Sequence, residues 1–199
     1  SELSPMQVQM ILQTAVSPRP IALASTIDKN GNVNLSPFSF FNLFSSNPPI
    51  LIFSPARRVR DHSTKDTLHN VLEVPEVVIG NVNFDMVQQV SLSSTEYETG
   101  VDEFIKSGLT KKPAELVKPP LIAESPVNFE CKVIEVKPLG NEGGAGNLVI
   151  CEVLKIHIRE EFLNEEGNLD QKKLDLVSRL GGNWYGRTTA ETLFEVPKP

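Results

Sequence analysis

The sequence has few cysteines and no long hydrophobic run. Its only cysteines among 199 residues are Cys131 and Cys151, and with no sign of export we interpret both as reduced, buried thiols. No apolar stretch approaches the roughly 18 residues that are needed to span a bilayer. The N-terminus also lacks the basic-then-apolar layout of a secretory signal. We therefore expect a cytoplasmic protein that does not enter a membrane.

The sequence also has no excess of positive charge and no recognisable catalytic motif. The net charge of −6 argues against a nucleic-acid-binding protein, because nothing would offset phosphate repulsion over a broad face. His62, His69 and His157 are too scattered to predict a metal site. No Ser-His-Asp arrangement and no pair of carboxylates stands out, so we name no catalytic residue and no metal ligand. If the protein is an enzyme, a cofactor is expected to carry its chemistry.

The chain does contain a succession of short strands joined by turns. Alternating or apolar segments predict six strands, over 20–27, 33–38, 49–54, 76–82, 127–137 and 148–159. Helix signals occur over 5–15, 84–93, 102–106 and 170–177, and a further helix is expected to start at 66. Hairpin turns and few long helices favour an antiparallel barrel. The glycines at 143–146 lie between two predicted strands, and they are therefore interpreted as a hairpin tip rather than a nucleotide-binding loop.

The size and composition predict a single domain over 1–199. We expect an N-terminal helix within 1–17, a proline-rich connection over 95–126 that wraps the surface, and a C-terminal tail over 179–199.

An aromatic and hydroxyl-rich run spans 34–42. Phe40 and Phe41 are adjacent, so in a strand they point to opposite sides and both faces meet something apolar. Ser36 and Ser39 add hydrogen-bonding groups between them. The run suits a wall that holds a flat, polar-edged aromatic ligand, and the alternative is a buried strand that passes under a subunit interface.

A basic loop precedes the helix expected at Asp66. Three arginines between 57 and 60 and Lys65 lie just before this helix start, which also offers Thr67 and unpaired backbone N–H groups. A helix N-terminus binds phosphate readily, and arginine adds bidentate contacts. The alternative is a solvated, charged loop followed by a well-capped helix.

A glycine-rich aromatic segment follows near the C-terminus. The run 179–187 contains the only tryptophan, one of the two tyrosines and two arginines around three glycines. Glycines allow close backbone approach and the aromatic rings offer stacking surfaces. Both a ligand-facing loop and a subunit-contact tail fit this pattern.

Taken in order, these segments resemble one family, the flavin reductase-like proteins with an FMN-binding split β-barrel (flavoredoxin-like). The resemblance runs from about Arg19 to Tyr185. It rests on six motifs: Pro18-Arg19-Pro20-Ile21, the run 34–42, Pro48-Pro49, the run 65–70, the run 124–131 and Arg179-Leu180-Gly181-Gly182.

The resemblance implies a mainly β protein, a six-stranded antiparallel Greek-key split barrel with peripheral helices. It implies a homodimer with FMN bound near the interface. The 34–41 segment would contact the isoalloxazine ring, Ser54 and the basic loop through Thr67 would hold the phosphate, and the tail would lie near the exposed ring face. From the resemblance, the residues expected to contact the cofactor are Arg19, Asn34, Ser36, Pro37, Phe38, Ser39, Phe40, Ser54, Arg57, Arg58, Lys65, Asp66, Thr67 and Tyr185. The 57–64 loop is a few residues longer than in relatives, which leaves open which arginine meets the phosphate.

The expected function is that of an FMN-dependent oxidoreductase, an NAD(P)H:flavin reductase in which NADH or NADPH donates hydride to flavin N5. A monooxygenase or another electron-acceptor protein is a further expected partner. Two other functions remain open: a flavin-bound electron carrier without a nicotinamide site, and a non-enzymatic FMN-binding module.

Overall fold

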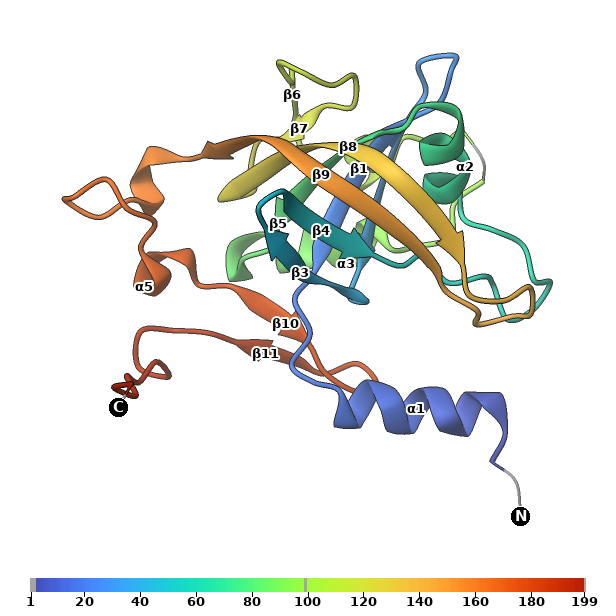
Figure 1. The fold of residues 1–199 in the computed structure, drawn as a ribbon, viewed down its shortest axis with the longest axis horizontal. Helices are drawn as coiled ribbons and strands as arrows, with labels where there is room; N and C mark the ends of the chain where they lie inside the picture. Colours follow the sequence, from blue (N-terminus) through green and yellow to red (C-terminus); the bar gives the residue numbers. More distant parts are fainter. Residues whose placement is uncertain (1–2, 99, 199) are drawn as a thin grey trace.

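The computed structural model describes residues 3–98 and 100–198 (Figure 1). The extreme ends of the predicted segments 1–17 and 179–199, and one residue of the 95–126 connection, lie outside these described residues. The main sheet consists of β1 (Ala22–Ile27), β2 (Val33–Phe38), β3 (Phe41–Ser46), β4 (Pro49–Phe53), β5 (Glu76–Asn81), β8 (Val127–Pro138) and β9 (Asn147–Ile158).

These seven strands are ordered β2-β1-β5-β8-β9-β4-β3, and every neighbouring pair is antiparallel. The sheet curls into a barrel that is split between β2 and β3, where the described residues form no ladder. The predicted mainly β split barrel is therefore confirmed, although it has seven strands rather than six. The additional strand is β3, whose side chains are mostly exposed and whose pairing with β4 is interrupted by a bulge near Leu43, so it lacks the alternation that reveals a strand.

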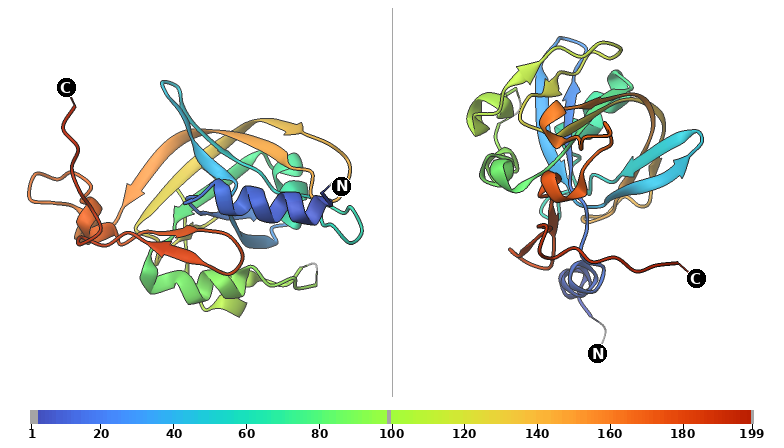
Figure 2. Two further views of the ribbon diagram at one scale, coloured as in Figure 1. Left: turned by 90° about the horizontal axis from the view of Figure 1, so that it is seen from below. Right: turned by 90° about the vertical axis from the view of Figure 1, so that its left-hand side faces the viewer.

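Helices and two small hairpins surround the barrel (Figure 2). The helices are α1 (Pro5–Ala15), α2 (Asp66–Glu73), α3 (Val87–Ser93), α4 (Glu103–Ser107) and α5 (Gln171–Leu174), with 3-10 turns η1 (Phe84–Met86) and η2 (Glu160–Phe162). The hairpins are β6 (Lys111–Lys112) with β7 (Leu121–Ile122), and β10 (Val177–Arg179) with β11 (Tyr185–Arg187). None of the described helices is long and apolar enough to cross a bilayer.

Helix α1 begins as its sequence predicts. Ser4 Oγ accepts a hydrogen bond from the Gln7 backbone N–H at 3.3 Å, and the Gln7 side chain accepts one from the Ser4 N–H at 2.9 Å, which forms a capping box. None of the residues of α1 is buried, and the helix lies beside the β10–β11 hairpin, away from the barrel (Figures 1 and 2).

Two apolar clusters flank the sheet. One fills the barrel with residues such as Phe53, Val77 and Ile79, and the other packs α3 and α4 against the outer face through Val90, Phe104 and their neighbours. Cys131 and Cys151 belong to the first cluster and are free thiols. Burial raises the pKa of Cys131 to about 12, so this thiol is an inert core residue, as its interpretation from the sequence requires.

The two long strands depart from simple alternation. Glu130 on β8 points away from the core cluster yet is fully buried, because the 113–118 segment of the wrapping connection covers it. On β9 the apolar residues Leu154, Ile156 and Ile158 are 43%, 54% and 40% exposed. The outer end of β9 therefore presents an apolar face that is uncovered in the single chain.

Candidate functional site

Six of the predicted site residues meet at one small cavity. This cavity, of about 40 Å³, lies between β2 and the N-terminal end of α2. Its lining residues are Asn34, Ser36, Arg58, Lys65, Asp66 and Thr67, together with Glu96, Tyr97 and Glu103.

The start of α2 is open to a ligand. Lys65 is the N-cap residue, it has an extended backbone, and no side chain caps the helix. The interpretation of this segment as a well-capped helix is therefore wrong. An uncapped helix start leaves backbone N–H groups without partners at the positive end of the helix dipole, which favours an anion.

Two cations lie at this helix start. Arg58 donates through Nη1 to Ser63 Oγ at 3.2 Å and to the Thr64 carbonyl oxygen at 2.5 Å, which fixes its guanidinium. Lys65 Nζ lies 5.3 Å from the centroid of the Phe38 ring. Burial lowers the pKa of Lys65, the charge of Arg58 lowers it further, and Glu96 opposes both effects. An incoming anion would relieve this repulsion between the two cations.

A buried hydrogen-bond network orients the opposite wall. Asn34 Nδ2 donates to Thr67 Oγ1 at 2.9 Å and to Thr26 Oγ1 at 3.5 Å, and Asn70 Nδ2 donates to the same Thr26 oxygen at 3.1 Å. All four side chains are buried. The network joins β1, β2 and α2, so the position of Thr67 relative to β2 is fixed by the fold.

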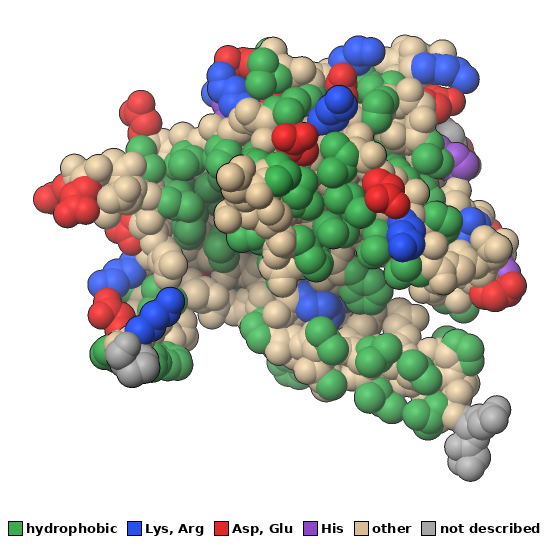
Figure 3. Space-filling view, in the orientation of Figure 1, with side chains coloured by type: hydrophobic (Ala, Val, Ile, Leu, Met, Phe, Trp, Pro, Cys, Tyr) green, Lys and Arg blue, Asp and Glu red, His purple; other side chains and the backbone are tan. Residues whose placement is uncertain are grey.

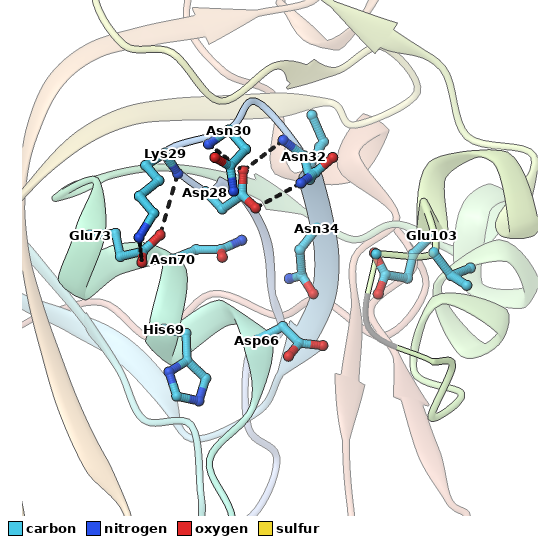
Figure 4. Close-up of a pocket in the computed structure, with 13 residues that line it drawn as sticks. Asp28, Lys29, Asn30, Asn32, Asn34, Asp66, His69, Asn70, Glu73 and Glu103 are labelled. Carbon is cyan, nitrogen blue, oxygen red and sulfur yellow. Dashed lines mark hydrogen bonds and ion pairs between the residues drawn. The ribbon is translucent and has the colours of Figure 1, made fainter.

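A larger, acidic pocket of about 440 Å³ adjoins the cavity and shares Asn34, Asp66 and Glu103 with it (Figure 4). Glu103 is buried and accepts a hydrogen bond from the Leu35 N–H at 3.0 Å. Burial raises the pKa of Glu103, and the nearby Asp66 and Asp102 add to the shift. The sequence did not indicate Glu103 or Glu96, because each is distant in the chain from the strands it approaches.

Arg19 lies elsewhere and holds the chain ends together. Its guanidinium donates to the carbonyl oxygens of Gln13, Val16 and Leu180, and Nε lies 3.5 Å from Ser39 Oγ. Arg19 is buried, and its backbone pairs with Arg179. The structure therefore gives Arg19 a role in tying α1 to the C-terminal hairpin, and Ser39 accompanies it rather than the cavity.

The aromatic run divides between core and surface. Phe38 is buried and packs against Phe53 in a tilted arrangement with ring centroids 5.3 Å apart, so its side chain belongs to the core. Phe41 packs partly buried against the same cluster, whereas Phe40 is 42% exposed. Phe40 lies in the bend between β2 and β3, so within the single chain only one of the two adjacent phenylalanines packs on the core. Pro37 lies half-buried between Ser36 and Phe38.

Phe40 and Arg57 line a second, mainly apolar groove of about 440 Å³, whose other wall is α1. The adjacent residues Arg57 and Arg58 therefore face different spaces, the groove and the cavity. Of these two arginines, only Arg58 lines the cavity at the start of α2.

The glycine-rich hairpin tip supports the basic loop. The Arg57 N–H donates to the Ala145 carbonyl oxygen at 2.9 Å, and the Gly144 N–H donates to the Arg57 carbonyl oxygen at 3.0 Å. A Cβ on Gly143 would lie 2.7 Å from Val59 Cα, so only glycine permits this approach. Ser54 is buried beside Gly146, at the base of the same contact.

Tyr185 is not among the cavity residues. Its ring lies under the Arg179 guanidinium at 4.5 Å, and it lines a separate surface pocket with Phe84 and Val87. Within a single chain, β11 therefore lies near α3 rather than over the cavity.

Fold and site together define a split-barrel protein with a cavity, lined by both basic and acidic residues, between β2 and the uncapped start of α2. Residues 15–175 match the family model for the flavin reductase like domain, and the chain belongs to this family. An uncharacterized protein of Halalkalibacterium halodurans is 38% identical over 187 residues, which cover 93% of this chain and 88% of that protein.

Two solved structures are similar over nearly the whole chain. Nitrilotriacetate monooxygenase component B from Bacillus cereus has a TM-score of 0.90 at 26% identity, covering 98% of this chain and 95% of that one. The 2-nitrobenzoate 2-nitroreductase NbaA of Pseudomonas fluorescens has a TM-score of 0.86 at 27% identity, covering 98% and 93%.

Proposed function

We propose that the protein binds FMN, with the phosphate in the cavity at the start of α2. The match to the flavin reductase like domain supports a flavin as the ligand. The uncapped start of α2, with Arg58 and Lys65 beside it, supports a phosphate group on that flavin. Thr67 adds a hydroxyl that is held in place by Asn34. This helix start is the observation that carries the proposal, because a flavin without a phosphate would leave it unused.

The isoalloxazine ring is proposed to lie along the 36–40 segment, where the end of β2 bends toward β3. Ser36 lines the cavity and Phe40 lines the apolar groove, so this segment connects a polar and an apolar space. A ring with one polar and one methylated edge suits such a boundary. Ser54 and Arg57 would then support the segment through the hairpin tip rather than contact the phosphate.

The proposed activity is that of an NAD(P)H:flavin reductase. Bound flavin would supply the redox chemistry by accepting hydride from NADH or NADPH. The chain's own contribution is to bind and orient the flavin. Lys65, Arg58 and Thr67 would hold the phosphate; the buried amide network positions Thr67, and Ser63 and Thr64 position Arg58. Since no side chain of the cavity needs to transfer a proton for this step, we propose no catalytic residue. The similarity to a monooxygenase component favours an oxygenase as the electron acceptor.

A homodimer is proposed from the uncovered apolar surface. Leu43 and Phe44 on β3 are 62% and 63% exposed. The outer end of β9 also presents exposed apolar side chains, and so does α1 through Met6, Met10 and Leu12. Figure 3 shows hydrophobic side chains gathered over this face of the barrel and along α1. A surface of this extent on a single chain calls for a partner, and a second copy would cover the groove beside Phe40. The free, buried cysteines fit the proposed cytoplasmic location.

An absorption experiment tests flavin binding and the reductase activity. The absorption spectrum of the purified protein, before and after anaerobic addition of NADH or NADPH, should show a flavin that is bleached by one of them. Flavin bleaching by neither nucleotide would favour an electron carrier or a storage module instead.

The phosphate site is tested separately. The double variant Lys65→Ala with Thr67→Ala should weaken FMN binding by about 2–4 kcal/mol, because charge-assisted contacts are lost. Riboflavin, which lacks the phosphate, should bind the variant and the native protein alike. Equal losses for FMN and riboflavin would place the phosphate elsewhere.

A further inference from the structure

The cavity already holds a carboxylate of the chain itself. Glu96 lines it, and its Oε1 lies 3.3 Å from Arg58 Nε while its Oε2 lies 2.7 Å from Arg60 Nη1. Glu96 therefore bridges two arginines of the basic loop with both of its oxygens. A carboxylate bridging two guanidinium groups resembles the arrangement that a phosphate would adopt there.

Glu96 belongs to the segment that follows α3, not to the basic loop. The segment turns back through a hydrogen bond from the Tyr97 N–H to the Thr95 carbonyl oxygen at 3.0 Å, and the Tyr97 hydroxyl donates to the Leu92 carbonyl oxygen at 3.3 Å. Tyr97 also lines the cavity. The backbone beside Glu96 is thus held by hydrogen bonds within its own segment, whereas its side chain pairs with the basic loop.

The side-chain exposures of the pair are unequal. The Arg58 side chain is 20% exposed and is fixed by Ser63 and Thr64, whereas the Glu96 side chain is 52% exposed. The cation is therefore the rigid partner, and the carboxylate can leave toward solvent at small cost. Glu96 also lies close enough to Lys65 for its charge to act on the pKa of that amine.

Resting on the proposed phosphate site, we propose that Glu96 is an internal competitor of the flavin phosphate. It neutralises the basic loop in the ligand-free protein and must be displaced when the phosphate enters. Its charge then repels the bound phosphate and shortens the residence of the flavin. The protein would accordingly handle FMN as an exchangeable substrate and product rather than retain it.

The test uses Glu96→Gln, with Glu98→Gln as the matched control. Glu98 is two residues away on the same segment, is exposed, and does not line the cavity. Titration of each full-length protein with FMN and riboflavin, by quenching of flavin fluorescence, gives the dissociation constants, and stopped-flow dilution gives the release rate of FMN.

We expect Glu96→Gln to bind FMN about tenfold more tightly and to release it correspondingly more slowly, because a like charge beside the phosphate is gone. The gain should shrink as salt is raised. Riboflavin binding should not change, and Glu98→Gln should behave as the native protein does.

Three results would overturn the competitor role. Unchanged FMN affinity in Glu96→Gln would show that the two charges do not compete, and weaker affinity would show that Glu96 instead positions Arg58. Equal tightening by Glu98→Gln would show a general charge effect. These failures differ from failure of the phosphate site itself, which the Lys65 and Thr67 double variant reports.

Discussion

Replacing Glu130 should expose how the wrapping connection is attached to the barrel. Its buried carboxylate accepts hydrogen bonds from the backbone N–H groups of Glu115, Leu116 and Val117, at 3.0, 2.6 and 3.1 Å. His157 Nε2 lies 2.5 Å from the same carboxylate. One side chain thus holds a segment that carries few other polar anchors.

The cost of Glu130→Ala follows from these bonds. A hydrogen bond to a charged acceptor contributes about 1.5–3 kcal/mol, so loss of three would cost about 5–9 kcal/mol if the donors stayed dry. Leu116 is 58% exposed, however, and the segment can peel away to hydrate its N–H groups. We therefore expect a loss of about 3–5 kcal/mol, a large share of the roughly 5–15 kcal/mol that stabilises a typical domain.

The same carboxylate predicts a dependence on pH. Burial raises the pKa of Glu130, but the hydrogen bonds from Glu115, Leu116, His157 and Val117 together outweigh it, so its pKa in the folded state is lowered. Its contribution is therefore fully present above the unfolded value of about 4.3 and is lost as pH falls through the lower folded value. Glu130→Gln removes this dependence and should flatten the stability profile below about pH 4.5.

Urea unfolding followed by far-ultraviolet circular dichroism, repeated from pH 3 to pH 7, measures both effects. Glu135→Ala is the control, since Glu135 is an exposed residue of the same strand and should change stability by no more than about 0.5 kcal/mol. A loss below about 1 kcal/mol for Glu130→Ala, or an unchanged acid profile for Glu130→Gln, would refute the reasoning.

Three further predictions concern the loop, the chain ends and the assembly. Gly143→Ala should lower stability by about 1–3 kcal/mol and weaken FMN binding, because its Cβ would meet the Val59 backbone at 2.7 Å; calorimetry and flavin titration check this, and an unaffected variant would contradict the close approach. Arg19→Ala should lower stability by about 2–3 kcal/mol and speed thermolysin cleavage within α1, since its guanidinium holds carbonyl groups at both chain ends; unchanged cleavage would show that α1 is held otherwise. Phe44→Glu should convert a dimer to a monomer in analytical ultracentrifugation, whereas Leu92→Glu on α3, which is also half exposed, should not; a native Phe44→Glu dimer would place the interface elsewhere.

Local signals in the sequence predicted the elements whose causes are local. The Ser4 and Gln7 side chains, three positions apart, cap α1, and the alternation of apolar and polar residues along β8 and β9 identified both as strands. The start of α2 was placed correctly at Asp66, because an acidic residue in that position favours the first turn of a helix. In each case the residues that form the element also identify it.

The rest depends on contacts between distant segments. Strand β3 escaped prediction because its apolar residues Leu43 and Phe44 are exposed and do not alternate with buried residues. Glu130 alternates with core residues, so the sequence pattern predicts that it faces solvent. In the structure the 113–118 segment covers it. Glu96 and Glu103 reach the cavity only through the packing of α3 and α4 against β2. A sequence pattern shows which face of an element is apolar, but it does not show which other segment packs against that face.

The charges around the cavity bear on how tightly a flavin would be held. Arg58, Arg60 and Lys65 lie within reach of Glu96, and Asp66 and Glu103 complete the lining. A dianion that enters such a balanced site gains less than it would from uncompensated cations, because its attraction to Arg58 replaces the existing ion pair with Glu96. Discrimination between FMN and riboflavin would then come mainly from contacts that no carboxylate of the chain already satisfies: those of the Lys65 amine, the Thr67 hydroxyl and the uncapped backbone N–H groups at the start of α2. Salt should accordingly weaken FMN binding only moderately in the native protein and more steeply in Glu96→Gln, where the arginines face the phosphate uncompensated.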